Sequence, residues 1–241
     1  LSAASAGALL EIDASSVVRA NASVTPGGLY GAGLICIGPD TRISVAGTVQ
    51  DNWVEEGFPS AGGGLYLIDL CLAVLEPGAV IERNSAAVGG GAYVASGSRL
   101  EGGGAGMLGA RISQNAATAG GGLHVWGSNS VAALHNVRIE SNQAREGAGV
   151  YVESGALVEL SRTADRNCAG APRCLTLSHN ILFDDAESEG FGSAAFVLNG
   201  GEFRMSQGFI EGNGGFGDAG LLIMAYTQDN VLELEGVQIW N

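Results

Sequence analysis

The feature that most constrains this chain is an internal repeat built around an aliphatic residue followed three places later by asparagine. Ile81-Glu-Arg-Asn84 and Ile112-Ser-Gln-Asn115 are two of its copies. Successive asparagines lie 31, 32, 31, 27, 38 and 33 residues apart. The repeated asparagines are Asn21, Asn52, Asn84, Asn115, Asn142, Asn180 and Asn213. A period of about 30 residues is typical of a solenoid, in which each copy makes one circuit around a common axis.

A glycine cluster followed by a short strand forms the second part of the repeat. In most copies its glycine lies seven residues after the asparagine, as Gly91 does after Asn84. Strand segments such as Leu65-Tyr-Leu67 and Val150-Tyr-Val152 carry aliphatic or small residues at their first and third positions. Since side chains alternate along a strand, these positions predict an interior face, and the middle residue predicts the opposite face.

The remaining part of each repeat also has the pattern of strands. A second alternating run precedes each asparagine, as in 131–139, and no segment shows convincing helical periodicity. Glycines suit the corners, while an asparagine can stack amide upon amide and tolerates positive φ at a bend. We therefore predict an all-β fold, a single-stranded right-handed parallel β-helix of about seven to eight coils.

The repeat also predicts the organisation of the chain. One β-helix domain spans 1–241, with loop insertions near 53–61, 161–174 and 183–192. The last copy, 237–241, is out of register by one residue, and the chain stops within it. We therefore expect a piece of a longer polypeptide.

Composition excludes several classes of protein. The hydrophobic fraction of 46% is too high for disorder. The net charge is −14, and such an acidic body repels phosphate backbones, so we expect no nucleic-acid partner. No apolar run approaches the roughly 20 residues of a membrane helix, so no transmembrane segment is expected.

The four cysteines suggest an oxidising compartment. Cys168 and Cys174 bracket a short loop, which a disulfide would tie down. Cys36 and Cys71 are a weaker pair, because they lie in neighbouring repeats at different offsets. The alternative is four reduced thiols, two of them buried.

The two repeated motifs together resemble a known family. Gly-Gly-aliphatic segments combined with aliphatic-x-x-Asn resemble the GGA[ILV] and FxxN repeats of chlamydial-type polymorphic outer-membrane proteins, and more widely bacterial right-handed β-helix surface proteins. The resemblance covers roughly residues 18 to 241, with Val, Ile or Leu in place of the family's Phe. It implies a surface-exposed or secreted β-helical passenger, often an adhesin.

The middle strand position is the sharpest candidate binding feature. Down the stack it forms an aromatic ladder, which consists of Tyr66, Tyr93, His124, Tyr151 and Phe196. With the flanking aliphatic residues inside, this ladder is expected outside, where aromatic faces could grip a sugar chain or a protein. Two alternatives stay open: the rings stack only to stabilise the sheet, or the long insertions fold over them.

A metal site has one weak candidate. Asp184, Asp185 and Glu187 lie in an acidic loop that also contains a glycine, and their oxygens are ligands that calcium prefers. The spacing is not that of an EF-hand, so a solvated acidic loop is the alternative. We expect no other cofactor.

Catalytic motifs are missing from the sequence. The Gly-His-Gly of pectin-type hydrolases is absent, and His124, His135 and His179 each stand alone. We therefore predict a non-catalytic extracellular, cell-surface or periplasmic bacterial scaffold that binds a protein or glycan through an exposed strand face, in the manner of an adhesin. The alternatives are a structural subunit that docks neighbours in a larger assembly and a polysaccharide lyase or hydrolase.

Overall fold

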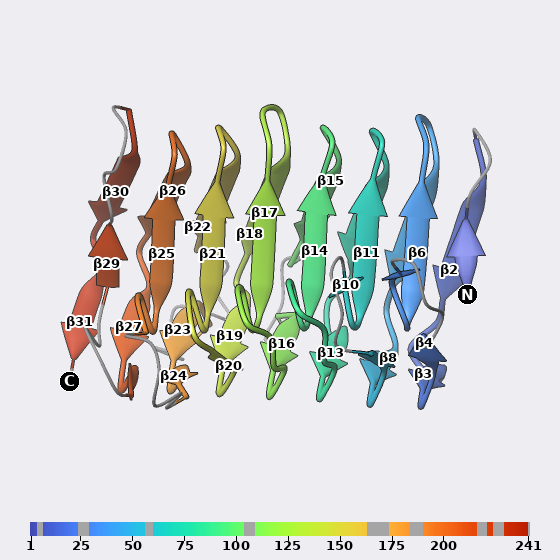
Figure 1. Ribbon diagram of the computed structural model, residues 1–241, viewed down its shortest axis with the longest axis horizontal. Coiled ribbons are helices and arrows are strands. Elements are labelled where there is room, and N and C mark those ends of the chain that lie inside the picture. Colours follow the sequence, from blue (N-terminus) through green and yellow to red (C-terminus); the bar gives the residue numbers. More distant parts are fainter. Residues whose placement is uncertain are drawn as a thin grey trace.

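The computed structural model describes residues 1–3, 7–23, 29–55, 60–103, 109–162, 174–183, 190–215, 221–223 and 229–240. Every regular element in these ranges is a β-strand, and every strand pairing is parallel. Strands from successive circuits lie side by side along one long axis (Figure 1). The predicted fold, a right-handed parallel β-helix, is confirmed.

Three long sheets of eight strands each form the walls of the coil. Sheet A contains β1 (Ser2–Ala3), β6 (Leu34–Ile37), β11 (Leu65–Ile68), β14 (Ala92–Ala95), β17 (Leu123–Trp126), β21 (Val150–Glu153), β25 (Ala195–Leu198) and β29 (Leu221–Ile223). Sheet B contains β2 (Leu9–Ile12), β7 (Arg42–Val45), β12 (Leu72–Leu75), β15 (Arg99–Gly102), β18 (Val131–His135), β22 (Leu157–Ser161), β26 (Glu202–Ser206) and β30 (Val231–Glu235). Sheet C contains β3 (Val17–Arg19), β8 (Thr48–Gln50), β13 (Val80–Glu82), β16 (Arg111–Ser113), β19 (Arg138–Glu140), β23 (Thr176–Ser178), β27 (Phe209–Glu211) and β31 (Gln238–Trp240).

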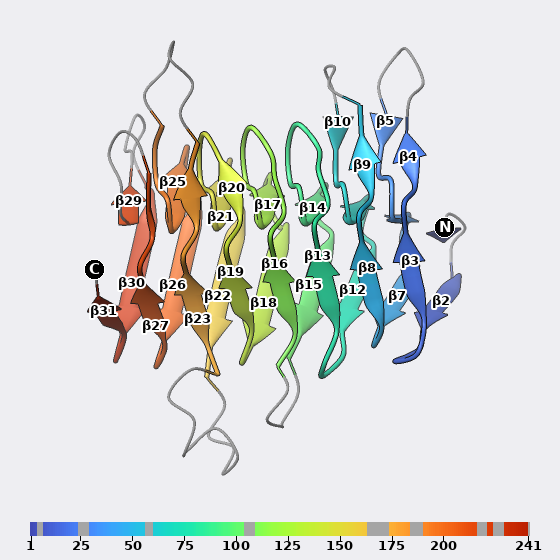
Figure 2. The ribbon, with the colours of Figure 1, turned by 90° about the horizontal axis from the view of Figure 1, so that it is seen from below.

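Shorter strands follow the asparagines and lead back toward sheet A (Figure 2). They are β4 (Ala22–Ser23), β9 (Trp53–Val54), β20 (Gln143–Ala144), β24 (Ile181–Leu182) and β28 (Gly214–Gly215), with β5 (Leu29–Tyr30) and β10 (Ser60–Ala61) beyond them. Six complete turns lie between Asn21 and Asn213. The expected count of seven to eight coils is higher because it includes the partial coils at both ends.

The interior is filled by the aliphatic positions that the repeat marks as inward-facing. Equivalent residues pair in register from coil to coil, as Ile81 does with Val49 and Ile112. These side chains are fully buried and belong to one continuous hydrophobic cluster along the axis. The inward-facing positions predicted from the alternation of side chains along each strand are therefore confirmed as the core.

The bend before each asparagine is made by a residue other than the one expected. Asp51, Arg83 and Gln114, which each precede a ladder asparagine, have φ of 55°, 52° and 56°. The expectation that asparagine itself takes the left-handed conformation is wrong for the described copies. The asparagine amide must instead point along the stack, so the turn is completed one residue earlier.

The glycine cluster is required by close approach between coils. A Cβ added to Gly91 would lie 2.4 Å from the carbonyl oxygen of Gly122 and 2.9 Å from Nδ2 of Asn115, both in the next coil. Gly64 and Gly122 are confined in the same way by the following glycine and asparagine. The two repeated motifs are therefore one device, because the glycine of each coil makes room for the asparagine of the next.

Candidate functional site

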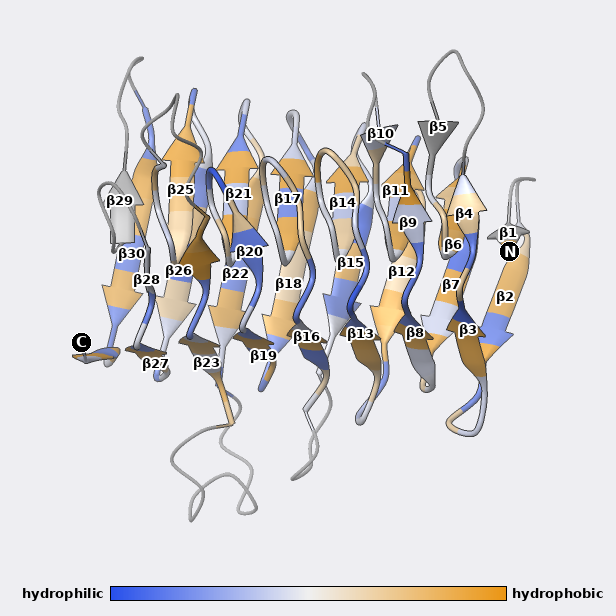
Figure 3. Ribbon diagram, turned by 60° about the horizontal axis from the view of Figure 1, so that its bottom comes forward, coloured by the Kyte–Doolittle hydropathy of each residue, from blue (hydrophilic) through white to orange (hydrophobic). Residues whose placement is uncertain are grey.

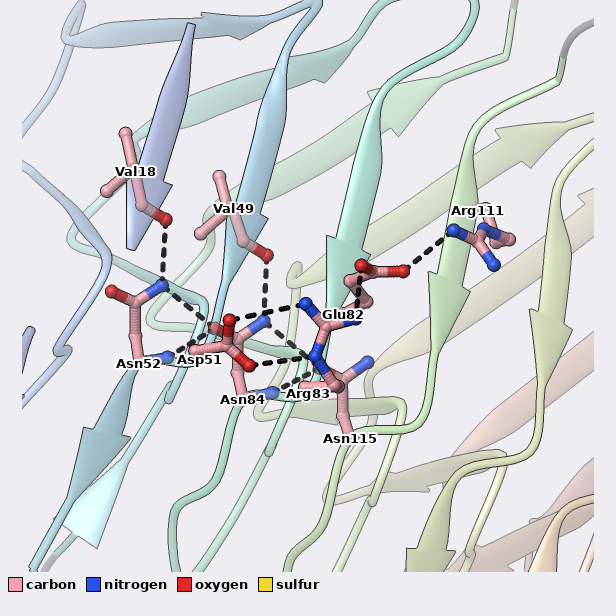
Figure 4. A network of polar contacts seen from close by, with 9 residues as sticks. All are labelled: Val18, Val49, Asp51, Asn52, Glu82, Arg83, Asn84, Arg111 and Asn115. Carbon is pink, nitrogen blue, oxygen red and sulfur yellow. Dashed lines mark hydrogen bonds and ion pairs between the residues drawn. The ribbon is translucent and has the colours of Figure 1, made fainter. Parts of the chain in front are cut away.

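The asparagines form a continuous hydrogen-bonded ladder inside the coil (Figure 4). Nδ2 of Asn84 donates to Oδ1 of Asn115 at 3.1 Å, and the backbone N–H of Asn84 donates to the same oxygen at 2.9 Å. The second proton of Nδ2 goes to the carbonyl of Val49 at 3.0 Å. The same arrangement continues as far as Asn213.

This bonding explains the aliphatic-x-x-Asn motif. The carbonyl that accepts from each asparagine belongs to the aliphatic residue of the preceding coil, as Ile81 does for Asn115. The interior amides are almost completely excluded from water, and Asn115 uses both donors and both acceptor positions of its side chain. The ladder is a structural element, because a buried amide with every hydrogen bond satisfied has none left to offer a ligand.

A charged network borders the ladder on the outside of sheet C (Figure 4). Arg83 pairs with Asp51 at 2.8 Å and also with Glu82, and Glu82 pairs with Arg111 at 2.7 Å. The hydrogen bond from Arg83 lowers the pKa of Asp51, and the two carboxylates raise the pKa of Arg83. Asp51 and Arg83 are exposed whereas the Glu82 side chain is only 12% exposed. The four side chains pair with one another, so the network ties coils together.

A disulfide joins Cys36 to Cys71 in the core, with Cα atoms 5.9 Å apart. Cys36 lies in β6 of sheet A, and Cys71 lies directly before β12 of sheet B in the following coil. The different offsets that weighed against this pair are explained by the corner between the two sheets, which brings the positions together. Cys174 is also disulfide-bonded, whereas Cys168 lies outside the described residues.

The aromatic ladder is formed, but the expectation that it is exposed is wrong. Tyr66, His124, Tyr151 and Phe196 are 3%, 5%, 5% and 3% exposed, and Tyr93 is half-buried. Neighbouring rings are in contact, with centroids 4.6 Å apart for His124 and Tyr151 and 5.6 Å apart for Tyr66 and Tyr93.

Where the structure describes it, the segment before the glycine cluster covers the ladder. There the chain runs across the outside of sheet A, linked from coil to coil by parallel bridges such as Val88 to Ala119. Phe191, from the insertion predicted near 183–192, also stacks on Phe196, with ring centroids 6.1 Å apart. A Cβ on Gly120 or Gly147 in this covering segment would lie 2.7 Å and 2.8 Å from the Cβ atoms of His124 and Tyr151. The rings are therefore enclosed between sheet A and this segment.

Titratable side chains surround His124 within this layer. Nε2 of His124 lies 3.3 Å from Oε1 of Glu153, and its buried Nδ1 has no hydrogen-bond partner among the described residues. Burial raises the pKa of Glu146, against the opposing charge of Arg145. Burial, with Glu153 and Glu146, raises the pKa of Tyr151. The cluster is enclosed, so it is a poor docking surface.

The proposed calcium ligands Asp184, Asp185 and Glu187 lie outside the described residues. Within the ranges that are described, no group of three or more His, Cys, Asp or Glu side chains is arranged to hold a metal ion. None of the described segments forms an apolar helix of membrane-spanning length.

The outer face of sheet B is an open strand face that the sequence reasoning did not identify. Its outward residues occupy two rows that run along the axis, and none of them is buried. One row is Leu9, Arg42, Leu72, Arg99, Val131, Leu157, Glu202 and Val231. The other is Glu11, Ser44, Val74, Glu101, Ala133, Glu159, Arg204 and Glu233. Hydrophobic and hydrophilic residues alternate along these strands (Figure 3).

The outer face of sheet B is acidic. Eight carboxylates lie on its strands or directly after them, Glu11, Asp13, Glu76, Glu101, Glu159, Glu202, Glu233 and Glu235. Against four guanidinium groups in the same places, Arg42, Arg99, Arg162 and Arg204, this leaves a net charge of −4. The polar positions of the second alternating run are the signal that could have revealed this face.

A cavity of about 520 Å³ opens on this face near its C-terminal end. It lies over β22, β26 and β30 and is bordered by Glu159, Arg204, Glu233 and Glu235. Arg204 is one of its lining residues and pairs with Glu202 at 2.9 Å and with Glu233 at 3.2 Å. The cavity is wide enough for a side chain of a partner protein.

Comparison with known proteins gives this chain no relatives: no protein-family model, no curated protein and no solved structure matches it.

Proposed function

We propose that this chain is a non-catalytic extracellular scaffold that binds a protein through the outer face of sheet B. The observation that carries the proposal is that this face is open along all eight strands and mixes carboxylates with half-exposed aliphatic side chains. The partner that fits it presents basic and aliphatic side chains on a flat surface, because opposite charges steer association and apolar contact supplies affinity.

The dimensions of the face suit such a partner. Eight strands span about 34 Å along the axis, and the four or five residues of each strand span about 13 to 17 Å across it. The resulting area of roughly 450 to 600 Å² on one partner is that of a transient protein interface, up to the lower limit of standard ones. The cavity around Arg204 would receive one anchoring side chain of the partner.

The compartment is proposed from the disulfide between Cys36 and Cys71. Disulfides persist in oxidising surroundings, so the bond supports a location outside the cytosol. The repeat motifs resemble those of bacterial surface proteins, and this supports the same location.

The test is a charge reversal on the open face. Purified chain is assayed for binding to a panel of secreted proteins, half with positive and half with negative net charge. We expect binding to a few of the positive proteins, weakened at least about tenfold by Glu101→Arg with Glu159→Arg and Glu233→Arg. The matched control, Glu55→Arg with Glu140→Arg and Glu211→Arg, makes the same charge change away from sheet B, directly after β9 and on sheet C.

The control separates recognition from general charge attraction. Equal losses in both triple variants would show that the positive proteins respond to net charge alone. Binding that survives the reversal on sheet B would place the interface elsewhere. Either result would overturn the proposal.

A further inference from the structure

A second surface feature lies where the chain leaves the asparagine ladder. The first residues after successive asparagines, Trp53, Ser85, Ala116, Gln143 and Ile181, are linked by parallel bridges into a row that we call the post-ladder row. The residues two places further on, which include Ala87, Thr118 and Phe183, run alongside it.

Small side chains leave a depression in the post-ladder row. In two neighbouring coils all three residues after the asparagine are small, at 85–87 and 116–118. The coil before them carries Trp53, the coil after them carries Gln143 and Arg145, and Phe183 follows one coil further on. Trp53 and Phe183 are 45% and 37% exposed. Small residues between large ones produce a trough of about 150 Å³, lined by 85–87, 116–118 and Phe183.

The trough combines the groups that bind a sugar ring. A pyranose presents one face of C–H groups, which packs against an aromatic ring such as Phe183, and an edge of hydroxyl groups. Ser85 and Thr118 have exposed hydroxyl groups that can donate and accept, and Ala86 and Ala117 form a flat apolar floor. The combination of an apolar floor with a few polar groups is usual for small-ligand sites.

The size and charge of the trough limit the class of ligand that it can bind. Its volume is well below the 300–1,000 Å³ that is roughly typical of drug-sized ligands, and it suits a single ring. None of the lining residues carries a charge, so the trough offers a uronate or phosphate no ion pair. We propose that this trough binds one ring of a neutral glycan.

The test uses neutral tetrasaccharides of glucose, mannose, galactose and N-acetylglucosamine, with tetragalacturonate as the acidic comparison. Binding is measured by calorimetry on the whole chain. We expect at least one neutral tetrasaccharide to bind with Kd of about 1 mM or lower, and tetragalacturonate to bind more weakly. Ala116→Leu fills the trough and should weaken binding at least about tenfold, and Phe183→Ala should weaken it as well.

Ala22→Leu is the matched control. Ala22 pairs with Trp53 and holds the same place in the repeat as Ala116, but it lies beyond Trp53 and outside the trough. It should leave saccharide binding unchanged, and equal thermal unfolding temperatures would show that both leucine variants fold.

The proposal would be overturned if no neutral tetrasaccharide bound at about 10 mM. It would also be overturned if tetragalacturonate bound as tightly as the neutral tetrasaccharides, or if Ala116→Leu and Ala22→Leu weakened saccharide binding equally. If Ala116→Leu abolished protein binding while no saccharide bound, the trough would instead receive an apolar side chain of the protein partner. Protein binding through sheet B is measured separately, so the two proposals can fail independently.

Discussion

The asparagine ladder makes a quantitative prediction about Asn115, which lies near the middle of the stack. Asn115→Ala removes four hydrogen bonds. Nδ2 donates to Oδ1 of Asn142 and to the carbonyl of Ile81, each at 3.0 Å. Oδ1 accepts from the backbone N–H and the Nδ2 of Asn84 at 2.9 Å and 3.1 Å.

The expected cost follows from these bonds. Each buried hydrogen bond contributes about 1 kcal/mol net, and a buried donor left without an acceptor costs more. The backbone N–H of Asn84 would lose its acceptor in the fully buried interior. We therefore expect Asn115→Ala to lower the free energy of unfolding by about 4 kcal/mol.

Asn21→Ala is the matched control for this prediction. Asn21 begins the ladder and is exposed, and its side chain makes one ladder bond, to Oδ1 of Asn52 at 2.7 Å. The same substitution there should cost less than about 1 kcal/mol.

The assay is urea unfolding followed by circular dichroism, with the midpoint and slope compared between the variants. A reduced slope for Asn115→Ala would indicate that the coils on its two sides unfold separately, as neighbouring repeats of a solenoid can. If both variants lost the same small amount of stability, the argument from saturated buried amides would be wrong.

Two further predictions concern the covered layer and the core. Burial raises the pKa of Glu146, so the ionised carboxylate destabilises the fold at a pH above its ordinary pKa. Glu146→Gln should therefore raise the unfolding temperature at about pH 7 and have little effect on it below about pH 4. An equal rise in unfolding temperature at both pH values would contradict this prediction. Replacing both Cys36 and Cys71 by alanine removes a disulfide between residues 35 positions apart in the sequence. Urea unfolding should show a free energy of unfolding lower by about 4 kcal/mol. Equal stability of the wild type and the variant would refute a stabilising role for this disulfide.

Most of the fold could be predicted from the sequence because the information is repeated. The pattern of Ile81 and Asn84 returns in each coil, so one circuit determines the next, and parallel stacking follows from the common period. The inward positions, such as Leu65 and Leu67, follow from alternation along a strand, which is a local property of the backbone.

The candidate sites could not be predicted in the same way. Tyr66 and Tyr151 do point away from the core, but their exposure depends on where the chain between the asparagine and the glycine cluster runs. The trough beside Phe183 depends on side chains from separate coils that become neighbours only when the coils stack.

The sequence by itself determined the winding of the chain, the amide ladder and the composition of the core, since each depends on residues at fixed positions within one repeat. The tertiary structure alone decided which strand face is open, which cysteines meet at the corner between sheets A and B, and which ladder is covered. These features arise between coils and between sheets, where residues that are distant in sequence meet, and no pattern within a single repeat specifies them.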